Sequence, residues 1–549
     1  MDAIRIDWAE PSARVYHAEY WVGVNPMDWE EPSMDSTDEG GDYLPVSRQV
    51  MGNWVPFPKG AVTDGSGGRV TLDLADEPVD TRFVRVVMPQ CHPGPAAGHD
   101  PGDARSRLGC AIHEVHVGRL ASDGAFPDRV VHAADEARQT VTYCSSTDPW
   151  HVAAGLIPRR AQTGLDLFFT SGITNHLPAM IPVAVVYSTP EDAAAEVAYL
   201  KKRGYAVGWM EMGEERDGQY MMPEDYATLY MQFADAMHKA DPALQLGGPV
   251  FQGIRQDVSV WADAQGRTSW FGRFLDYLKA HGRLQDLTFV SFEIHPYNAR
   301  SMQWKDLYRV RPLSRKRLQT FWDDGLPKRI PLMNTESNLC GSLSRWMSDI
   351  FSALWLADTI GSFFLYGGGA YLHSPIQAGG INHDGQGWAT WGNFVWGPNN
   401  AVTDHTAFYW ASRVINLEWV KHGIGEHRLY AVDATVEDAA GNALVTTYAV
   451  ERPGGEWALL IVNRDRARPH DGTVTFQGAV APGFFTGPVR MVAYGSEQYV
   501  WHGETAQAYA APHDLPQEST LGVGEGASVR LPKASITVLR GKAAGFRFD

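Results

Sequence analysis

Two apolar, strand-length runs of the sequence each end in a glutamate. Residues 206–215 read AVGWMEMGEE, and residues 329–337 read RIPLMNTES. Because side chains alternate between the two faces of a strand, Glu211 and Glu215 share one face of the first run, and Glu336 lies at the end of the second. A pair of carboxyl groups can cleave a glycosidic bond: the protonated one donates to the leaving oxygen, and the ionised one attacks the anomeric carbon. Glu215 and Glu336 are therefore the candidate catalytic pair.

Each of these glutamates also has a structural interpretation. Glu215 could be a solvated strand end and Glu336 a helix-capping residue, while Glu211 fits a buried, hydrogen-bonded acid better than a catalyst. Glu214, if ionised, would raise the pKa of a neighbouring carboxyl group by like-charge repulsion, which suits a general acid. Alternation along the strand turns Glu214 off the axis, so its role stays open.

The residues between 139 and 424 predict the scaffold that would position these acids. Eight apolar runs alternate with helical patterns; the runs are residues 140–146, 165–171, 179–187, 206–213, 243–250, 287–297, 329–337 and 360–369. Near-continuous apolar strands separated by amphipathic helices indicate a parallel sheet covered by helices, and eight such units predict a (β/α)8 TIM barrel. In that fold catalytic residues sit at the carboxyl ends of strands, here the fourth and the seventh.

Two of the helical patterns carry clear signals. Residues 189–204 begin with Thr189 as N-cap and Pro190 in the first turn, and they end in Lys-Lys-Arg-Gly. Residues 223–242 predict a second helix whose buried face is marked by apolar spacing. The residues on that face are Tyr226, Leu229, Tyr230, Phe233 and Met237.

Other polar and aromatic residues follow the predicted strands at the same end. The candidates for substrate binding are Asp148, Trp150 and His151 after the first run, His295 and Tyr297 at the end of the sixth, Tyr371 and His373 after the eighth, Trp388 in the next loop, and Glu214. Trp150 is either a sugar platform or a core residue. Trp388 and Trp391 in a glycine-rich loop fit a stacking wall in a sugar cleft, and a loop plug fits equally well. Glu293 points inward in the sixth run and can pair with a cation.

Two β-rich segments flank the predicted barrel. Residues 1–120 predict a β-sandwich, residues 121–138 a linker, and residues 425–549 a C-terminal β-sandwich, because short alternating runs are separated by turns. Cys91 and Cys110 flank a loop rich in Gly and Pro and could pair; the alternative is that all four cysteines are free thiols.

The motifs of the barrel segment, in their order, resemble clan A retaining glycoside hydrolases, especially family 39 and its relatives. MEMGEERDG is similar to the motif that carries the clan's acid/base after strand four, and LQLGGPV, FVSFEIHPY and PLMNTES are similar to its fifth, sixth and seventh strands. The resemblance implies that Glu215 is the acid/base and Glu336 the nucleophile. Glu214 departs from the clan, which has there an Asn that donates a hydrogen bond to the sugar 2-hydroxyl; an ionised carboxylate only accepts.

The N-terminal block resembles part of a discoidin-like module (coagulation factor 5/8 type C). The matching segments are EYWVG, Trp54 with the following FPKG, GGRVTLDLADEPVDTRFVRVVM and GCAIHEVHVG, within residues 3–119, and the usual opening strands are missing. Such modules often bind glycans or cell surfaces through loop tips. The resemblance favours a secreted or periplasmic protein, although MDAIRIDWAE is polar from its start and shows no signal peptide.

The composition excludes several classes of binding partner and cofactor. The formal net charge of −17 argues against nucleic acid and anionic membranes, which need a cationic surface. No apolar run reaches the roughly 18 residues that a membrane helix needs. The cysteines have no metal-ligand spacing and no nucleotide-binding glycine motif is present, so we expect neither a metal nor a cofactor.

The sequence therefore predicts a retaining glycoside hydrolase with a carbohydrate substrate. The clan resemblance leans toward β-linked, gluco- or xylo-configured glycans of plants or microbes. One alternative is a non-catalytic carbohydrate-binding protein on a barrel scaffold. Another is a metal-dependent barrel hydrolase, although the His-x-His that opens such a site after the first strand is missing.

Overall fold

The computed structural model describes residues 1–23, 52–92, 110–130, 164–186, 188–213, 221, 223–251, 267, 269–373, 380–423, 425–434, 436–477, 482–522 and 527–544. The chain divides into two compact units. The first comprises residues 1–32, 46–249 and 256–289, and the second comprises residues 33–45, 250–255 and 290–549. Within the described ranges, no helix is long and apolar enough to cross a membrane.

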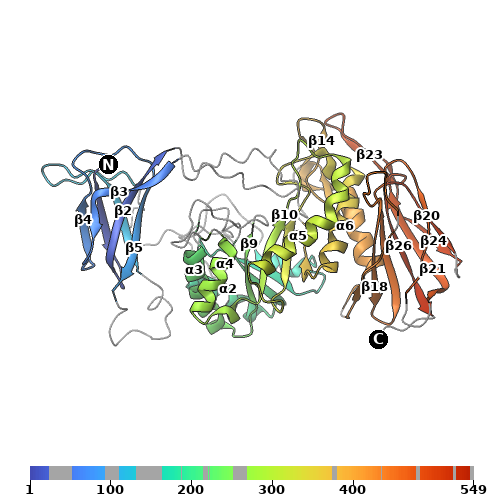
Figure 1. Cartoon of the computed structure of the whole chain (residues 1–549), viewed down its shortest axis with the longest axis horizontal. Coiled ribbons are helices and arrows are strands. Elements are labelled where there is room, and N and C mark those ends of the chain that lie inside the picture. The colour runs from blue at the N-terminus through green and yellow to red at the C-terminus, as the bar shows by residue number, and fades with distance from the viewer. Residues whose placement is uncertain are drawn as a thin grey trace. The chain divides into compact units, whose positions relative to one another are not determined.

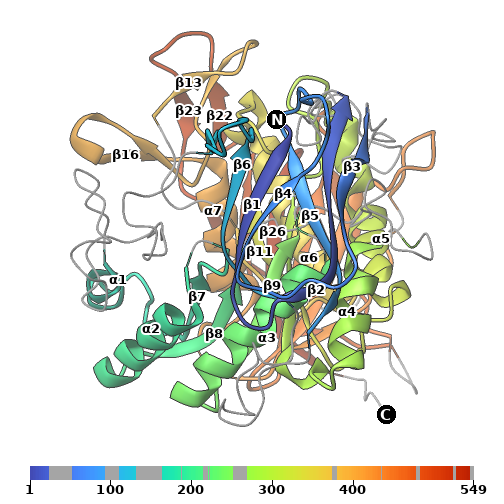
Figure 2. The same cartoon turned by 90° about the vertical axis from the view of Figure 1, so that its left-hand side faces the viewer.

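Six strands at the start of the first unit form two antiparallel sheets around one hydrophobic core (Figures 1 and 2). They are β1 (Ala3–Trp8), β2 (Ala13–Gly23), β3 (Gly52–Val62), β4 (Arg69–Asp73), β5 (Val84–Cys91) and β6 (Ile112–Gly118), in the orders β4-β1-β6 and β3-β2-β5. Alternation along β1 buries Ile4, Ile6 and Trp8. A disulfide joins Cys91 and Cys110. The sequence left open whether these two cysteines pair or all four are free thiols, and the structure shows that they pair.

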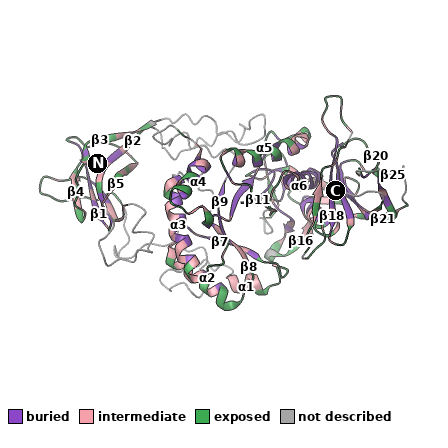
Figure 3. Ribbon diagram, turned by 60° about the horizontal axis from the view of Figure 1, so that its bottom comes forward, coloured by how far each residue is buried: buried purple, intermediate pink, exposed green. Residues whose placement is uncertain are grey.

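A parallel sheet of six strands follows. The strands are β7 (Ala179–Val183), β8 (Val207–Met212), β9 (Leu246–Phe251), β10 (Phe289–Ile294), β11 (Leu332–Ser337) and β12 (Ala370–Tyr371), in the order β12-β11-β10-β9-β8-β7. This sequential order is what consecutive strand–helix–strand units produce. Every residue of β9 and β10 is buried, and Figure 3 shows the ribbon of β9 in purple. Among the described residues the sheet has two edges, β7 and β12, so its closure into an eight-stranded barrel stays a prediction.

Two predicted strands are wrong. Residues 165–170 form helix α1 (Leu165–Thr170), and the predicted run 360–369 begins inside helix α6 (Ile350–Leu365), which is followed by β12. A short apolar run does not distinguish a buried strand from a buried helix, because both lack a polar face and therefore a period. The predicted run 140–146 lies outside the described residues.

Side-chain contacts explain why residues 165–170 become a helix. Asp166 on the first turn accepts hydrogen bonds from the hydroxyl of Tyr205 and, at 2.9 Å, from Nε of Arg203. Phe169, one turn further on, stacks on the ring of Tyr205 with the ring centres 4.3 Å apart. Residues three and four apart share a helix face, so the helix lets Asp166 and Phe169 contact the same neighbour.

The helices of the first unit include α2 (Pro190–Arg203), α3 (Pro223–Ala240) and α4 (Trp270–Ala280). The predicted caps of α2 are confirmed: the hydroxyl of Thr189 accepts from the backbone N–H of Asp192 at 3.1 Å, and Gly204 ends the helix in the left-handed conformation at φ 69°. On α3 the predicted face is buried at Tyr226, Tyr230, Phe233 and Met237, and half-buried at Leu229.

The second unit adds α5 (Val310–Asp323), α6, α7 (Ala407–Val414) and a π-helical turn (Ile415–Trp419). Short 3-10 helices cover Trp304–Arg309, Arg345–Met347 and Pro398–Asn400 in this unit and Leu284–Asp286 in the first. Two small hairpins follow β12 along the chain. They are β13 (Asn382–His383) with β14 (Trp388–Ala389), and β15 (Phe394–Trp396) with β16 (Val402–His405).

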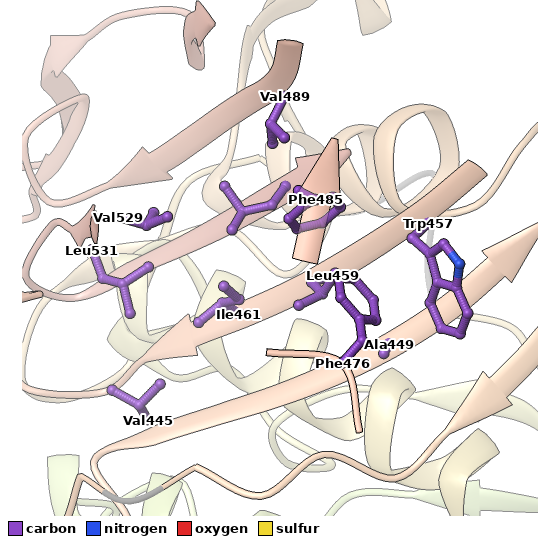
Figure 4. Close-up of a cluster of buried hydrophobic side chains, with 11 residues drawn as sticks. Val445, Ala449, Trp457, Leu459, Ile461, Phe476, Phe485, Val489, Val529 and Leu531 are labelled. Atoms are coloured by element: carbon purple, nitrogen blue, oxygen red, sulfur yellow. The ribbon is translucent and has the colours of Figure 1, made fainter. Parts of the chain in front are cut away.

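The chain ends in a β-sandwich. Its strands are β17 (Arg428–Tyr430), β18 (Val445–Arg452), β19 (Glu456–Asn463), β20 (His470–Thr473), β21 (Phe484–Gly495), β22 (Tyr499–His502), β23 (Tyr509–His513), β24 (Gln517–Leu521), β25 (Ser528–Leu531) and β26 (Ser535–Ala544). Six of them form a sheet in the order β17-β18-β19-β26-β21-β24, while β20 pairs with β25 and β22 with β23. Figure 4 shows the core between the six-stranded sheet and β25, which includes Trp457, Phe485 and Leu531.

A buried ionic cluster joins this sandwich to helix α6. Asp358 on α6 has no solvent exposure and pairs with Arg464, whose Nη1 lies 2.9 Å from Oδ2. Its Oδ1 accepts from the hydroxyls of Thr446 at 2.5 Å and Tyr448 at 2.6 Å. Arg464 also donates to the carbonyl oxygen of Leu307 at 2.8 Å. A buried charge is costly unless it is paired and hydrogen-bonded, and here both charges are.

Candidate active site

The carboxyl end of β11 departs from a regular strand. Phe292 on β10 pairs with Asn334, but the next residue, Glu293, pairs with Glu336, so Thr335 is an extra residue in the ladder. The side chain of Asn334 holds this bulge, because its Nδ2 donates to the carbonyl oxygens of Phe292 at 3.0 Å and Glu336 at 2.8 Å. Bulges of this kind are common beside active sites, where they redirect a side chain. Side-chain alternation along a regular strand would put Asn334 and Glu336 on one face and does not predict this break.

The bulge brings two carboxylates to one imidazole. The Nε2 of His295 lies 3.6 Å from Oε2 of Glu293 and 3.4 Å from Oε1 of Glu336. Glu293 and His295 are nearly fully buried, with side-chain exposures of 4% and 7%, whereas that of Glu336 is 37%. Glu336 therefore combines a contact with His295 on its inner side with access for a substrate. Glu293 pairs with a group that can carry positive charge, as its place in an apolar strand indicated.

Ser337 connects this cluster to the strand after it. Its hydroxyl donates to the carbonyl oxygen of Leu372 at 3.2 Å and lies 3.4 Å from Nδ1 of His373. Burial, opposed by a hydrogen bond with the backbone of Ser337 and assisted by the nearby His295, lowers the pKa of His373 to about 3. His373 is therefore neutral near pH 7. Burial also raises the pKa of Tyr371 above its usual range.

Several buried polar atoms at this edge of the sheet have no hydrogen-bond partner among the described residues. They are Nδ1 of His295, Oδ1 of Asn334, Oγ1 of Thr335 and Nε2 of His373. In native proteins such atoms are usually satisfied by water, an ion or a ligand. Their concentration beside Glu336 favours this edge as the place where a polar ligand binds.

Tyr297, which the sequence placed among the candidates for substrate binding, is buried in the second unit. Tyr297 is 4% exposed, and its hydroxyl donates to the carbonyl oxygen of Asp306 at 3.0 Å. Its ring packs edge-on against Phe351 with the ring centres 6.1 Å apart. These contacts give Tyr297 a structural role in the core.

The loop that contains Trp388 is tied to the end of β11. The Nδ2 of Asn338 donates to the carbonyl oxygen of Trp391 at 3.0 Å. Trp388 is half-buried, and its ring meets His383 edge-on with the ring centres 5.2 Å apart. Of the two interpretations of this loop, the partial exposure of Trp388 is compatible with a stacking surface.

The remaining predicted residues are either in the other unit or outside the described ranges. Glu211 lies in register with Pro182 on β7 and Gly247 on β9 and is half-buried. Asp148, Trp150, His151, Glu214 and Glu215 lie outside the described residues. Their predicted roles therefore stay predictions.

Three residues of the cluster could hold a metal ion. The ligand atoms of Glu293, His295 and Glu336 all lie within 4.8 Å of one another. Two carboxylates and an imidazole are ligands that divalent transition ions accept. The sequence predicted no metal because these ligands come from two strands and have no recognisable spacing in the chain. A single Glu inside the apolar run of β10 was the only signal of this arrangement.

Comparisons with known proteins find distant likenesses. No family model matches the chain, and no curated protein matches it. Among solved structures, the chain is similar to a family 44 endoglucanase from Clostridium thermocellum, with 10% identity, 69% of this chain and 84% of that chain covered, and a TM-score of 0.45. It is also similar to a family 51 arabinofuranosidase from Xanthomonas axonopodis pv. citri, with 15% identity, 66% and 76% covered, and a TM-score of 0.42. Likenesses at this level assign neither a family nor an activity to the chain.

Proposed function

We propose that the protein is a retaining glycoside hydrolase in which Glu336 is the nucleophile and Glu215 the acid/base. The observation that carries the proposal is the partly exposed carboxylate of Glu336 beside the buried pair of Glu293 and His295. A nucleophilic carboxylate has to be oriented on one side and open to substrate on the other.

The proposed reaction has two steps. Glu336 attacks the anomeric carbon, the glycosidic C–O bond breaks, and Glu215 gives its proton to the leaving oxygen. In the second step Glu215 takes a proton from water, which attacks the same carbon and releases Glu336. With its proton on Nε2, His295 would orient the carboxylate of Glu336, while Glu293 holds the imidazole from its buried side. This mechanism requires the two catalytic carboxyl groups to be about 5–5.5 Å apart.

The proposed substrate is a β-linked, gluco- or xylo-configured glycan. The resemblance of the motifs to clan A supports this choice, and Trp388 offers an aromatic surface on which a sugar ring can stack. The net charge of −17 favours a neutral glycan over an anionic one.

The metal-capable cluster supports a second candidate, a metal-dependent hydrolase. In that case Glu293, His295 and Glu336 would be ligands, and the ion would activate a water. A carboxylate that binds a metal is not free to attack a sugar, so the two candidates make opposite predictions. Chelation abolishes activity in the second candidate and leaves it unchanged in the first.

Covalent trapping tests the proposal directly. A panel of 2-deoxy-2-fluoro glycosides with good leaving groups should label the intact chain, and peptide mass spectrometry should find the label on Glu336. Glu336→Gln should lose about a thousand-fold or more of the activity on aryl β-glycosides, with activity of the unmodified chain insensitive to chelator. Glu215→Ala should keep activity on substrates with good leaving groups and recover with azide. Full turnover by Glu336→Gln would reject the assignment.

A further inference from the structure

The segment from Trp388 to Trp391 is held on one side by the elements of the candidate site. Asn338, two residues after Glu336, donates to the carbonyl oxygen of Trp391 at 3.0 Å. The backbone N–H of Thr390 donates to the hydroxyl of Ser348 at 3.0 Å, and Thr390 is fully buried. This side of the segment is therefore fixed to the end of β11 and the start of α6.

The C-terminal sandwich holds the other side of the same segment. The indole N–H of Trp501 on β22 donates to the carbonyl oxygen of Trp388 at 2.8 Å, and the N–H of Trp388 donates to the carbonyl oxygen of Gly503 at 2.8 Å. A Cβ on Gly503 would lie 2.6 Å from the carbonyl oxygen of Trp388, so only glycine permits this approach. Figures 1 and 2 show the β13–β14 and β22–β23 hairpins next to each other.

The β22–β23 hairpin presents an exposed aromatic side chain. Tyr509 is 55% exposed, and it is the only exposed side chain among the described Phe, Trp and Tyr residues. It pairs across the hairpin with His502, and their rings stack with the centres 5.1 Å apart and the planes 22° apart. The Nε2 of His502 contacts the carbonyl oxygen of Ala511 at 2.9 Å, which fixes the imidazole under the tyrosine.

We propose that Tyr509, supported by His502, is an additional sugar-binding position on the C-terminal sandwich, in the hairpin that also holds the segment of Trp388. This inference rests on the proposed function, and it adds that the substrate is a neutral glycan chain of several residues. A flat, immobilised ring suits the apolar face of a pyranose. His502 lies in the chain between Trp501 and Gly503, which bind the backbone of Trp388, so one hairpin carries both the proposed position and the contacts of Trp388.

The surroundings of Tyr509 favour a glycan over a protein partner. Stable protein interfaces bury about 800 Å² of surface on each partner. Here Glu504, which is 75% exposed, lies beside His502 with Oε1 3.8 Å from Nδ1. A tyrosine ring with acidic and imidazole neighbours offers stacking and hydrogen bonds to hydroxyl groups, and the acid disfavours anionic polymers.

Affinity electrophoresis of the full chain tests this proposal without depending on turnover. All variants carry Glu336→Gln, and the gels contain xyloglucan, mixed-linkage β-glucan or arabinoxylan. Tyr509→Ala should bind the retained glycan about three- to tenfold more weakly, whereas Tyr509→Phe should bind like the parent. Leu515→Ala is the matched control, because Leu515 is a 70% exposed side chain of the same sandwich, and it should not change binding.

Three results would overturn the proposal: equal binding by Tyr509→Ala and the parent, equal losses in Tyr509→Ala and Leu515→Ala, or no retardation by any glycan. A dimer that is lost in Tyr509→Ala would also overturn it in favour of a second copy of the chain. The proposed function fails separately, through full turnover by Glu336→Gln on aryl glycosides. If Glu336→Gln loses turnover but Tyr509→Ala binds glycan like the parent, only the additional sugar position is rejected.

Discussion

Asp358 and Glu336 are carboxylates of the same unit in opposite surroundings. Asp358 accepts from Thr446, Tyr448 and Arg464 at 2.5–2.9 Å and has no exposure. Within the described residues, the ring of His295 lies 3.4 Å from the carboxylate of Glu336, and more than a third of the Glu336 side chain is exposed. A carboxylate surrounded by short donors is bound to its own protein, whereas one with few and long contacts can still react. Substitutions at each carboxylate in turn should separate effects on stability from effects on activity.

The largest expected effect on stability comes from Asp358. Asp358→Ala would leave Arg464 buried without its carboxylate, which should cost about 3–5 kcal/mol of unfolding free energy. Denaturant unfolding followed by fluorescence measures this loss. Asp471→Ala is the control, because its pair with Arg530 is 58% and 66% exposed and should be worth at most about 1 kcal/mol. Equal losses of unfolding free energy in Asp358→Ala and Asp471→Ala would contradict the expected difference between a buried and an exposed ion pair.

Glu293→Gln should reduce activity and spare stability. The amide keeps the size of the side chain but removes the charge that faces His295, so Glu336 would lose its fixed orientation. We expect kcat to fall about 10- to 100-fold with little change in KM, and the melting temperature to stay within a few degrees. Glu293→Asp, which keeps the charge, should recover part of kcat. A rise in KM with an unchanged kcat would argue against a positioning role.

His373 should make stability depend on pH below neutrality. Its pKa is about 3 in the folded protein and near the ordinary 6.5 when unfolded, so the unfolded chain binds the extra proton between these values. Stability should therefore fall as the pH drops from about 6.5 toward 3, by at most about 1.4 kcal/mol per pH unit. His373→Asn should flatten the curve in this window. A curve of unchanged slope would exclude His373 as a contributor.

The smallest expected effect is the stability change in Glu336→Gln. Removing a charge beside Glu293 relieves repulsion between two carboxylates, so the unfolding free energy should stay constant or rise by about 1 kcal/mol or less. Calorimetry of the chain used for the activity assay gives this value. A large destabilisation would mean that Glu336 is a structural acid like Asp358.

The predictable parts of the fold are those that depend on neighbouring residues. The caps of α2 and the buried face of α3 follow from a few adjacent side chains, so they could be predicted. The strand expected at 165–171 is a helix because of Tyr205 and Arg203, which lie far along the chain. Likewise, α6 is buried along nearly its whole length, and its sequence shows no polar face to reveal a helix.

The candidate site could be predicted in its residues but not in its geometry. Glu336 and His295 follow apolar strands, and that pattern is visible in the chain. The bulge at Thr335 is not, because it depends on the register between β10 and β11 and on the amide of Asn334. Without the bulge, the pairing of Glu336 with Glu293 and the three-residue cluster around His295 could not be derived.

The contact between α6 and the sandwich also has an evolutionary consequence. A Cβ added to Gly361 on α6 would lie 2.3 Å from the ring of Tyr448, and Asp358 one turn earlier depends on the same strand. If the contact surface of α6 or that of the sandwich were exposed to water or packed against an unrelated neighbour, both surfaces would have to change in sequence. The sandwich is thus not an interchangeable appendage, and recombination that exchanged it would have to carry α6 along. The two should be inherited as one piece.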